Sequence, residues 1–317
     1  MTRKLVTSAA VFIALFSLLA AALAQTTTTT TTTTTSLPPV GQMALGPVGS
    51  SGGPEAVAFD GTFVWVTRQF TNSVMKIRAS TGVVDGTFAV GVRPVAVVTD
   101  SAAVWIANLE DNTVTKLRLA DGSVLGTFAV GNGPGGLMND GKNIWVSNRE
   151  DNTVMKLAAD GTRLGTFPVG RRPLGLAWDG TNVWVANNQD NTVTKLRGSD
   201  GANLGTFAVG KAPFGMAFDG GNIWVSNFFS GNVMKVRLRD GVVLGTFPVG
   251  DGAAGIVFDG LSVWVASNGA NGVTRLRPSD GAVQATAATG TGPFGVVSDG
   301  VSVWVANFGS DTISVVR

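Results

Sequence analysis

A repeat of about forty residues runs through almost the whole of this 317-residue chain. Each copy holds four short runs of β-branched and aromatic residues, separated by turn residues. A period near forty that holds four strands is typical of a β-propeller blade. The sequence therefore predicts an all-β, seven-bladed β-propeller with four antiparallel strands per blade. Seven tryptophans mark the copies, spaced by 40 residues with one spacing of 39: Trp65, Trp105, Trp145, Trp184, Trp224, Trp264 and Trp304.

The fourth copy shows the expected strands most clearly. We name them A to D from the central channel outward, and place them at residues 174–178, 182–186, 193–196 and 204–210. Asp-Gly pairs join A to B at Asp179 and C to D at Asp200. Because Asp-Gly supplies the positive φ angles of a tight hairpin, we interpret these aspartates as structural residues and not as metal ligands.

The two ends of the repeat region predict how the ring closes. The seventh copy starts at Pro293 and stops at Arg317, after its third strand. The segment at residues 44–49, Ala-Leu-Gly-Pro-Val-Gly, resembles the missing strand D. We expect this N-terminal strand to pair beside residues 312–316 and to close the last blade, which would hide its exposed edge.

The N-terminal region predicts export. Residues 1–24 combine a basic start at Arg3 and Lys4, an apolar stretch and a small-residue cleavage site ending at Ala24, which is typical of a secretory signal peptide. An uncleaved membrane anchor is the alternative. Residues 25–41, with ten consecutive threonines, are an expected linker before a propeller at residues 42–317. We expect a secreted, periplasmic or cell-surface protein with no membrane contact after cleavage; the threonine run could also be an O-glycosylated stalk.

Composition narrows the function classes. Without Arg3 and Lys4 the chain has 21 basic and 21 acidic residues, so its balance does not favour nucleic acid as a partner. It has no Cys and no His, and its only glutamates are Glu55, Glu110 and Glu150. Common nucleophiles and bases are therefore scarce, which leans against an enzyme. We expect a monomer without a cofactor; Ca²⁺ or Mg²⁺ in the central channel is the alternative.

The face formed by the B–C and D–A connections is the expected functional face, because the copies differ most there. Three rings can be read on it. Strand B ends at Arg68, Asn108, Asn148, Asn187, Asn227, Ser267 and Asn307. The channel mouth carries Glu55, Val95, Gly135, Leu174, Phe214, Ala254 and Phe294. The D–A loops include Arg93, Arg171, Arg172, Lys211 and Asp251.

These rings predict a basic half in copies one to four, which also holds Arg149, and an aromatic half in copies five to seven, which also holds Phe228, Phe229 and Phe308. Such a face suits an anionic small molecule, an amphipathic ligand, a glycan or a protein with an acidic patch. The asparagines could instead cap strand ends, and the arginines could be ordinary solvated charges. The candidate binding residues are Glu55, Arg68, Arg93, Asn108, Asn148, Arg171, Arg172, Asn187, Lys211, Phe214, Asn227, Phe294 and Asn307.

The copies resemble YVTN-type propeller repeats of bacterial exported proteins. The resemblance rests on Val-Trp-Val-Ala-Asn at residues 183–187, Asn-Thr-Val-Thr-Lys at 191–195 and Leu-Gly-Thr-Phe-Ala-Val-Gly at 204–210. It spans residues 42–317 and implies a propeller fold with a binding or surface role.

The Asp-Gly-x-x-Val-Trp-Val segments also resemble the repeat unit of virginiamycin B lyase. That resemblance implies a divalent metal, glutamates and a catalytic His on the same face. Here the matching strand ends carry amides, Ser267 and Arg68, and the chain has no His. A binding module therefore stays the first expectation. A metal-dependent lyase or a lactonase-type hydrolase, with Glu55 beside Asn108, Asn187 or Asn227, is the first alternative to it. A structural cell-surface protein is the second.

Overall fold

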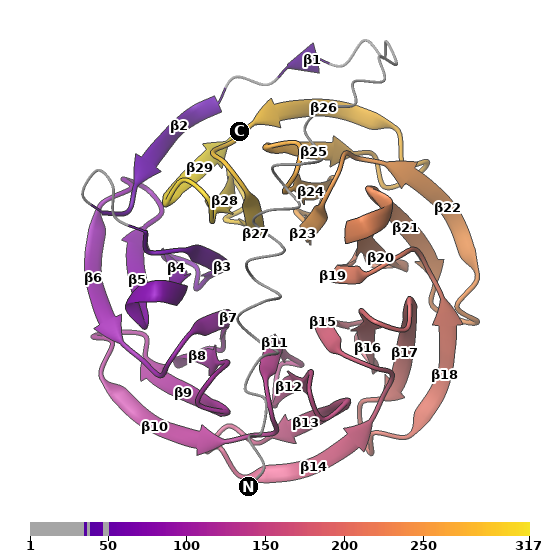
Figure 1. Ribbon diagram of the computed structural model, residues 1–317, viewed down its shortest axis with the longest axis horizontal. Coiled ribbons are helices and arrows are strands. Elements are labelled where there is room, and N and C mark those ends of the chain that lie inside the picture. Colours follow the sequence, from indigo (N-terminus) through magenta and orange to yellow (C-terminus); the bar gives the residue numbers. More distant parts are fainter. Residues whose placement is uncertain (1–34, 37–38, 47–50) are drawn as a thin grey trace, which may run out of the picture. The chain divides into compact units, whose positions relative to one another are not determined.

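The computed structural model describes residues 35–36, 39–46 and 51–317. Seven sheets of four antiparallel strands stand around a central axis, so the chain is a seven-bladed β-propeller, as the repeat predicts (Figure 1). The helices among the described residues are two short 3-10 turns, η1 (Gln69–Thr71) and η2 (Phe228–Ser230). None of the helices in these ranges has the length and apolar content needed to cross a membrane. The expected signal peptide lies outside the described residues, as does most of the expected linker.

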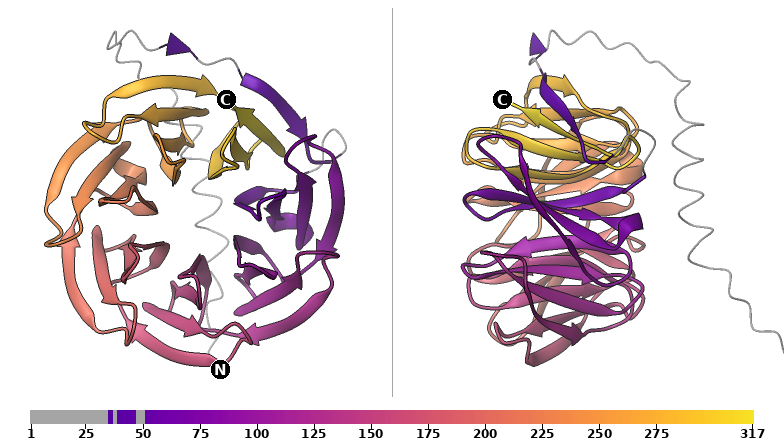
Figure 2. Two further views of the ribbon diagram at one scale, coloured as in Figure 1. Left: turned by 180° about the vertical axis from the view of Figure 1, so that it is seen from behind. Right: turned by 90° about the vertical axis from the view of Figure 1, so that its left-hand side faces the viewer.

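In every blade the first strand lies at the axis and the last at the rim, as the view from behind also shows (Figure 2). Blade 1 contains β3 (Pro54–Phe59), β4 (Phe63–Arg68), β5 (Ser73–Arg78) and β6 (Val84–Ala89). Blade 2 contains β7 (Pro94–Thr99), β8 (Ala103–Asn108), β9 (Thr113–Arg118) and β10 (Val124–Ala129). Blade 3 contains β11 (Pro134–Asn139), β12 (Ile144–Asn148), β13 (Thr153–Leu157) and β14 (Arg163–Pro168). Blade 4 contains β15 (Pro173–Trp178), β16 (Asn182–Asn187), β17 (Thr192–Arg197) and β18 (Asn203–Ala208).

The remaining blades complete the ring. Blade 5 contains β19 (Pro213–Phe218), β20 (Asn222–Asn227), β21 (Asn232–Arg237) and β22 (Val243–Pro248). Blade 6 contains β23 (Ala253–Phe258), β24 (Val263–Ser267), β25 (Gly272–Leu276) and β26 (Val283–Ala288), with the short β1 (Thr35–Ser36) parallel to its outer edge. Blade 7 contains β27 (Pro293–Ser298), β28 (Val303–Asn307) and β29 (Thr312–Val316), and its outer strand is the N-terminal β2 (Pro39–Ala44).

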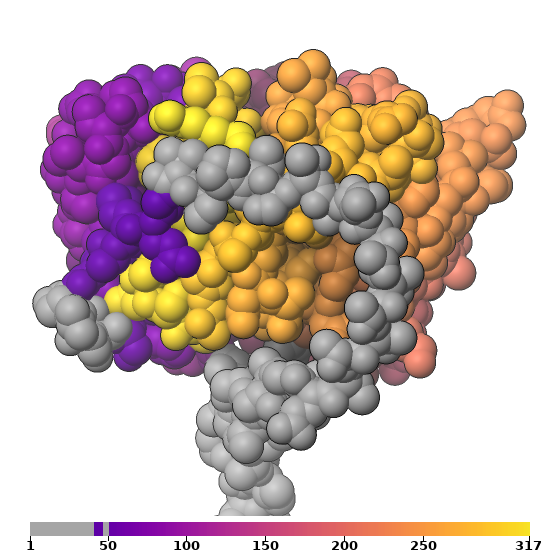
Figure 3. Space-filling model, turned by 90° about the horizontal axis from the view of Figure 1, so that it is seen from above, coloured from indigo at the N-terminus to yellow at the C-terminus, as the bar shows by residue number. Residues whose placement is uncertain are grey.

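The N-terminal strand closes blade 7 as expected, but with a different segment. Strand β2 pairs antiparallel with β29, with Met43 opposite Ile313, whereas the sequence had placed the closing strand at residues 44–49. Residues 47–49 lie outside the described residues. The register follows from side-chain packing, because Met43 occupies the place that Phe88 has in blade 1, and the sulfur of Met43 lies against Gly82 of the next blade. The space-filling view shows β2, in indigo, against the yellow C-terminal blade (Figure 3).

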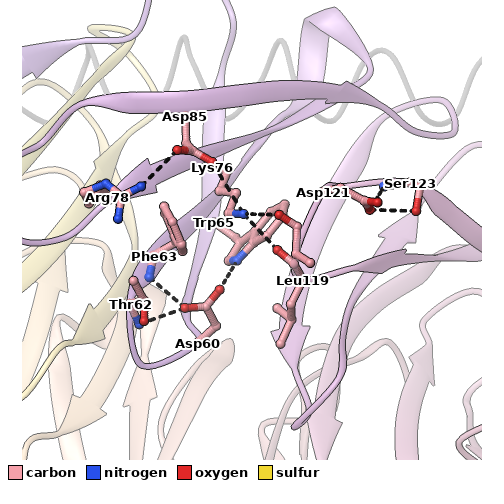
Figure 4. A network of polar contacts seen from close by, with 11 residues as sticks. Asp60, Thr62, Phe63, Trp65, Lys76, Arg78, Asp85, Leu119, Asp121 and Ser123 are labelled. Atoms are coloured by element: carbon pink, nitrogen blue, oxygen red, sulfur yellow. Dashed lines mark hydrogen bonds and ion pairs between the residues drawn. The ribbon is translucent and has the colours of Figure 1, made fainter.

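A buried tryptophan anchors each blade to its own A–B hairpin. Trp184 is fully buried, and its indole Nε1 donates to Oδ2 of Asp179 at 2.8 Å. The other carboxylate oxygen of Asp179 accepts the backbone N–H groups of Thr181 and Asn182. The same arrangement is present in all seven blades, and Figure 4 shows it for Trp65 and Asp60. The structural interpretation of these hairpin aspartates is thereby confirmed for the A–B turns.

A strand-C lysine links each of the first five blades to the next one. Lys76 lies over the Trp65 ring, is almost fully buried, and donates to the backbone oxygens of Leu119 and Ala120 in blade 2 at 2.8 and 3.0 Å (Figure 4). Corresponding lysines make the same link in blades 2 to 5. Blades 6 and 7 have Arg275 and Val315 at this position, so the two interfaces beside blade 7 lack the lysine link.

The closing strand is expected to carry a large share of the stability of the ring. A chain that starts at Ser51 lacks β2 and with it the packing of Met43 and the buried Leu45, besides the β29 hydrogen bonds. We expect its free energy of unfolding to be lower by about 3 kcal/mol or more than that of a chain that starts at Gln25. The measurement is denaturant unfolding of both chains. Coincident unfolding curves would contradict the closure described above.

The two kinds of hairpin aspartate are expected to differ in their contribution to stability. Asp179→Ala leaves the buried indole of Trp184 without an acceptor, so we expect a loss of about 2–4 kcal/mol. Asp200→Ala is the matched control, because Asp200 is exposed and pairs with the exposed Arg197; we expect about 1 kcal/mol or less. Chemical denaturation of the two variants measures both values. Equal losses would show that the indole contact is not the anchor.

Candidate functional site

The B–C and D–A connections lie together on one face of the propeller, and the asparagines at the ends of strand B lie underneath it. Asn187 is fully buried; its side-chain amide donates to the hydroxyls of Thr192 and Thr194 and accepts the N–H of Gly170. Comparable bonds hold Asn108, Asn148, Asn227 and Asn307, which are also fully buried. This geometry matches strand capping, so we do not include these side chains in the candidate ligand surface.

Arg68 also lies below the surface. Its guanidinium donates to Oδ2 of Asp311 at 3.0 Å, and both side chains are about nine-tenths buried. Asp311 belongs to blade 7, so this ion pair spans the interface where the chain closes. From the sequence, Arg68 was expected on the functional face, and Asp311 was not among the expected site residues. A signal was available, because Asp311 replaces an asparagine that five of the other blades carry at this position.

The mouth of the channel holds the ring expected from the residue after each repeat proline. Strand A positions these side chains, and the strands approach closely at the axis: a Cβ on Gly175 would lie 2.2 Å from the backbone oxygen of Phe214. Below the mouth, apolar side chains and glycines line a central cavity of about 210 Å³, among them Val97, Leu137 and Ile256.

Six phenylalanines form a continuous apolar arc over one part of the mouth. Phe214 of blade 5 and Phe294 of blade 7 are 5.8 Å apart between ring centroids, which is possible because blade 6 has the small Ala254 between them. The arc extends at one end through Phe228 to Phe229, and at the other through Phe308 to Phe70. The outermost rings, Phe229 and Phe70, are 55% and 53% exposed.

The arc brings together the phenylalanines that the sequence places in copies five to seven, and it adds a residue from blade 1 that was not expected there. Phe70 belongs to blade 1 and was not considered. Its signal was its position, because Phe70 lies two residues after the end of strand B, as Phe229 does in blade 5. Both residues lie in the 3-10 turns η1 and η2, the same local structure in two blades.

A cluster of charged groups faces the arc from blades 1 to 4. Glu55 accepts a hydrogen bond from the buried amide of Gln69. Desolvation raises the pKa of Glu55 to about 7, although the positive charges of Arg149 and Arg93 and the bond from Gln69 lower it. Burial also lowers the pKa of Arg149, and repulsion from Arg172 and Arg93 lowers it further. The cluster thus places three guanidinium groups and one poorly solvated carboxyl at the mouth.

Acidic partners reduce the basic character that the sequence predicted for this half. Arg93 pairs with Glu110 at 3.1 Å and Arg149 with Glu150 at 3.2 Å, and both glutamates are more than half exposed. Acidic partners that are this exposed reduce the positive potential of the arginines only weakly. Arg171, which is also exposed, pairs with Asp190 at 2.5 Å. Of the D–A loop residues, Arg93 and Arg172 lie with Arg149 near Glu55. Arg171 pairs with Asp190 instead, and Lys211 is exposed.

The candidate site offers little to a divalent cation. Among the described residues, no group of three or more acidic, His or Cys side chains is placed to hold a metal ion. The cavity below the mouth is lined by apolar side chains and glycines, whereas Ca²⁺ and Mg²⁺ prefer several oxygen ligands. An anion can bind to the guanidinium groups of this arrangement, and an apolar group can pack against its aromatic rings.

The pKa of Glu55 predicts a pH-dependent stability. In the folded protein Glu55 keeps its proton up to about pH 7, whereas an unfolded glutamate releases it near 4.5. Stability contributed by this group is therefore full below pH 4.5 and is lost as the pH rises toward 7. We expect Glu55→Gln to be more stable than the parent protein by about 1 kcal/mol or less at pH 5 and by about 3 kcal/mol at pH 8.

Denaturant unfolding at pH 5 and pH 8 checks this expectation. Glu110→Gln is the matched control, because it removes the same charge from an exposed position. We expect the control to show no comparable change between the two pH values. A Glu55→Gln variant that is equally stable relative to the parent at both pH values would argue against a raised pKa.

Comparison with known proteins identifies the fold and no family. No family model matches the chain, and no curated protein matches its sequence. A streptogramin B lyase structure superposes with a TM-score of 0.76 at 19% identity, covering 87% of this chain and 96% of the other. Virginiamycin B lyase from Staphylococcus aureus gives 0.75 at 17% identity, covering 87% and 98%. Hydrazine synthase of Kuenenia stuttgartiensis gives 0.75 at 19% identity, covering 92% and 99%.

Proposed function

We propose that this chain is an exported β-propeller binding module that recognises an anionic, partly apolar ligand at the channel mouth. The observation that carries the proposal is the division of the mouth into an arc of six phenylalanines and a cluster of three arginines around Glu55. Aromatic rings that lie partly exposed in a continuous arc offer apolar contact area, and guanidinium groups orient anions.

Export is part of the proposal and is supported by the N-terminal sequence. The basic start, apolar stretch and small-residue site of residues 1–24 are those of a secretory signal, and the YVTN-type resemblance of the repeats points to exported binding or surface proteins. We propose an anionic small molecule as the ligand. A glycan and a protein with an acidic patch are the other partners that this face could accept.

The proposal predicts that an aromatic sulfonate binds at the mouth. We expect 8-anilinonaphthalene-1-sulfonate to bind the folded protein, and we expect the pair Phe70→Ser with Phe229→Ser to weaken binding about three- to tenfold, because the arc loses its exposed ends. The pair Arg171→Ala with Arg172→Ala should weaken it by a similar factor through lost positive charge. Fluorescence titration measures the affinities.

The opposite face provides the matched control. Leu261 and Val301 are 77% and 76% exposed on the A–B hairpins of blades 6 and 7. The pair Leu261→Ser with Val301→Ser should leave the affinity unchanged. Equal affinity of the parent protein and both mouth variants would overturn the proposed site. Binding of a glycan or an acidic peptide in place of the sulfonate would move the function to those partners.

A lyase or hydrolase activity is the second candidate, and Glu55 is the observation that favours it. A carboxyl with a pKa of about 7 at a channel mouth could act as a general acid or base. Two of the structures with a similar fold are streptogramin-type lyases. Turnover of a streptogramin B compound or a lactone by the purified protein, abolished in Glu55→Gln, would support this candidate over a binding module.

A further inference from the structure

We infer that the ionised Glu55 competes with an anionic ligand for the arginines of the mouth. An amphipathic monoanion then binds there when Glu55 carries a proton. The ligand class is a molecule with an aromatic or aliphatic body and one anionic group, such as a carboxylate or a sulfonate. The inference rests on the proposed function and adds a specificity-determining residue to it. A molecule whose Glu55 is ionised takes up one proton from solvent on binding, and this proton goes to the Glu55 carboxylate; no covalent bond to the ligand forms.

An ionised Glu55 competes with an incoming anion. Its carboxylate acts on Arg149 and Arg93, whose other acidic partners are more than half exposed and screen only weakly. An anion that enters beside the ionised Glu55 would meet a like charge at these guanidinium groups. With a proton on Glu55 that negative charge is absent, and an incoming monoanion takes its place. Glu55 and the ligand therefore compete for the same guanidinium groups.

The surroundings of Glu55 allow it to hold or release a proton. The charged groups that act on it are Arg93, in the loop before β7, and Arg149, in the loop after β12. Desolvation raises the pKa of Glu55 to about 7, so the proton exchanges near neutral pH.

Gln69 can serve both protonation states of Glu55. Its Nε2 donates to the Glu55 carboxylate, and its buried Oε1 has no hydrogen-bond partner among the described residues. Turning the amide over would let that oxygen accept from a protonated Glu55.

The position of Glu55 in the ring places the anionic group beside the apolar arc. Strand β27 with Phe294 neighbours strand β3 with Glu55: a Cβ on Gly295 would lie 2.5 Å from the Glu55 backbone oxygen. Phe294 itself contacts Phe214, Phe228 and Phe308. A ligand whose anionic group replaces Glu55 at the arginines would therefore have its apolar body over Phe294.

Two probes with the same aromatic body test the inference. The first is 8-anilinonaphthalene-1-sulfonate, which stays anionic between pH 6 and 8; the second is N-phenyl-1-naphthylamine, which lacks the sulfonate and stays neutral. For the full-length protein we expect the sulfonate affinity to fall about tenfold from pH 6 to pH 8, following the protonated fraction of Glu55. The affinity of the neutral probe should not change with pH.

Two charge-matched variants separate Glu55 from general electrostatics. Glu55→Gln should bind the sulfonate as tightly at pH 8 as the parent protein does at pH 6, with no remaining pH dependence. Asp200→Asn removes one negative charge from an exposed hairpin on the opposite face, so it should keep the full tenfold pH dependence. Circular dichroism and thermal unfolding of both variants verify that they are folded.

The outcomes separate this inference from the proposed function. Sulfonate binding at the mouth that is independent of pH, or a pH dependence that persists in Glu55→Gln, would overturn the role of Glu55 and leave the binding module standing. A sulfonate that does not bind, or whose binding is insensitive to the Phe70 and Phe229 substitutions, would overturn the proposed function itself. Proton uptake of about one half per sulfonate bound at pH 7, rising toward about one at pH 8, would support the inference directly when measured by calorimetry in two buffers.

Discussion

The hydrogen bond between an indole N–H and a hairpin carboxylate is the interaction on which each blade depends. A tryptophan large enough to fill the space between two blades brings a polar N–H into the core, and that donor needs an acceptor. The aspartate five residues earlier supplies it and, with its second oxygen, fixes the A–B turn. One side chain thus couples the local hairpin to the packing between blades. Repeating this unit seven times leaves the opposite face free to vary.

The fold could be predicted because its determinants are local and repeated. The spacing of the tryptophans, the Asp-Gly turn pairs and the alternation of strand and turn segments each act within one repeat of about forty residues. The bounds of the closing strand were misplaced toward the C-terminus, because a Leu-Gly and a Val-Gly pair within residues 44–49 both resemble the end of strand D. The structure resolves this through Met43, which takes the position of a phenylalanine only when β2 ends at Ala44. A methionine in place of an aromatic ring is a weak sequence signal.

The candidate site could be predicted only in outline. The sequence indicated which face varies and predicted a basic half and an aromatic half. The arc of phenylalanines extends beyond the predicted aromatic copies to Phe70 of blade 1. The sequence could not separate a side chain that ends a strand from one that faces solvent. The asparagines and Arg68 were therefore expected on the functional face, whereas their side chains are buried in hydrogen bonds. Contacts between blades that are far apart in sequence, such as Arg68 with Asp311, depend on ring closure. Their only signal in the sequence is that both residues depart from the repeat.

In blade 6, a small side chain at the channel mouth shapes the candidate binding surface. Ala254 ends its side chain at Cβ, and this lets rings from two blades that are not neighbours meet across it. The span of the apolar surface is thus set by side-chain volume at a position that takes no part in the indole anchor or the lysine link. Enlarging that one side chain would divide a single extended platform into two smaller ones, and ligand size could be tuned there while the folding determinants of the blade stay the same.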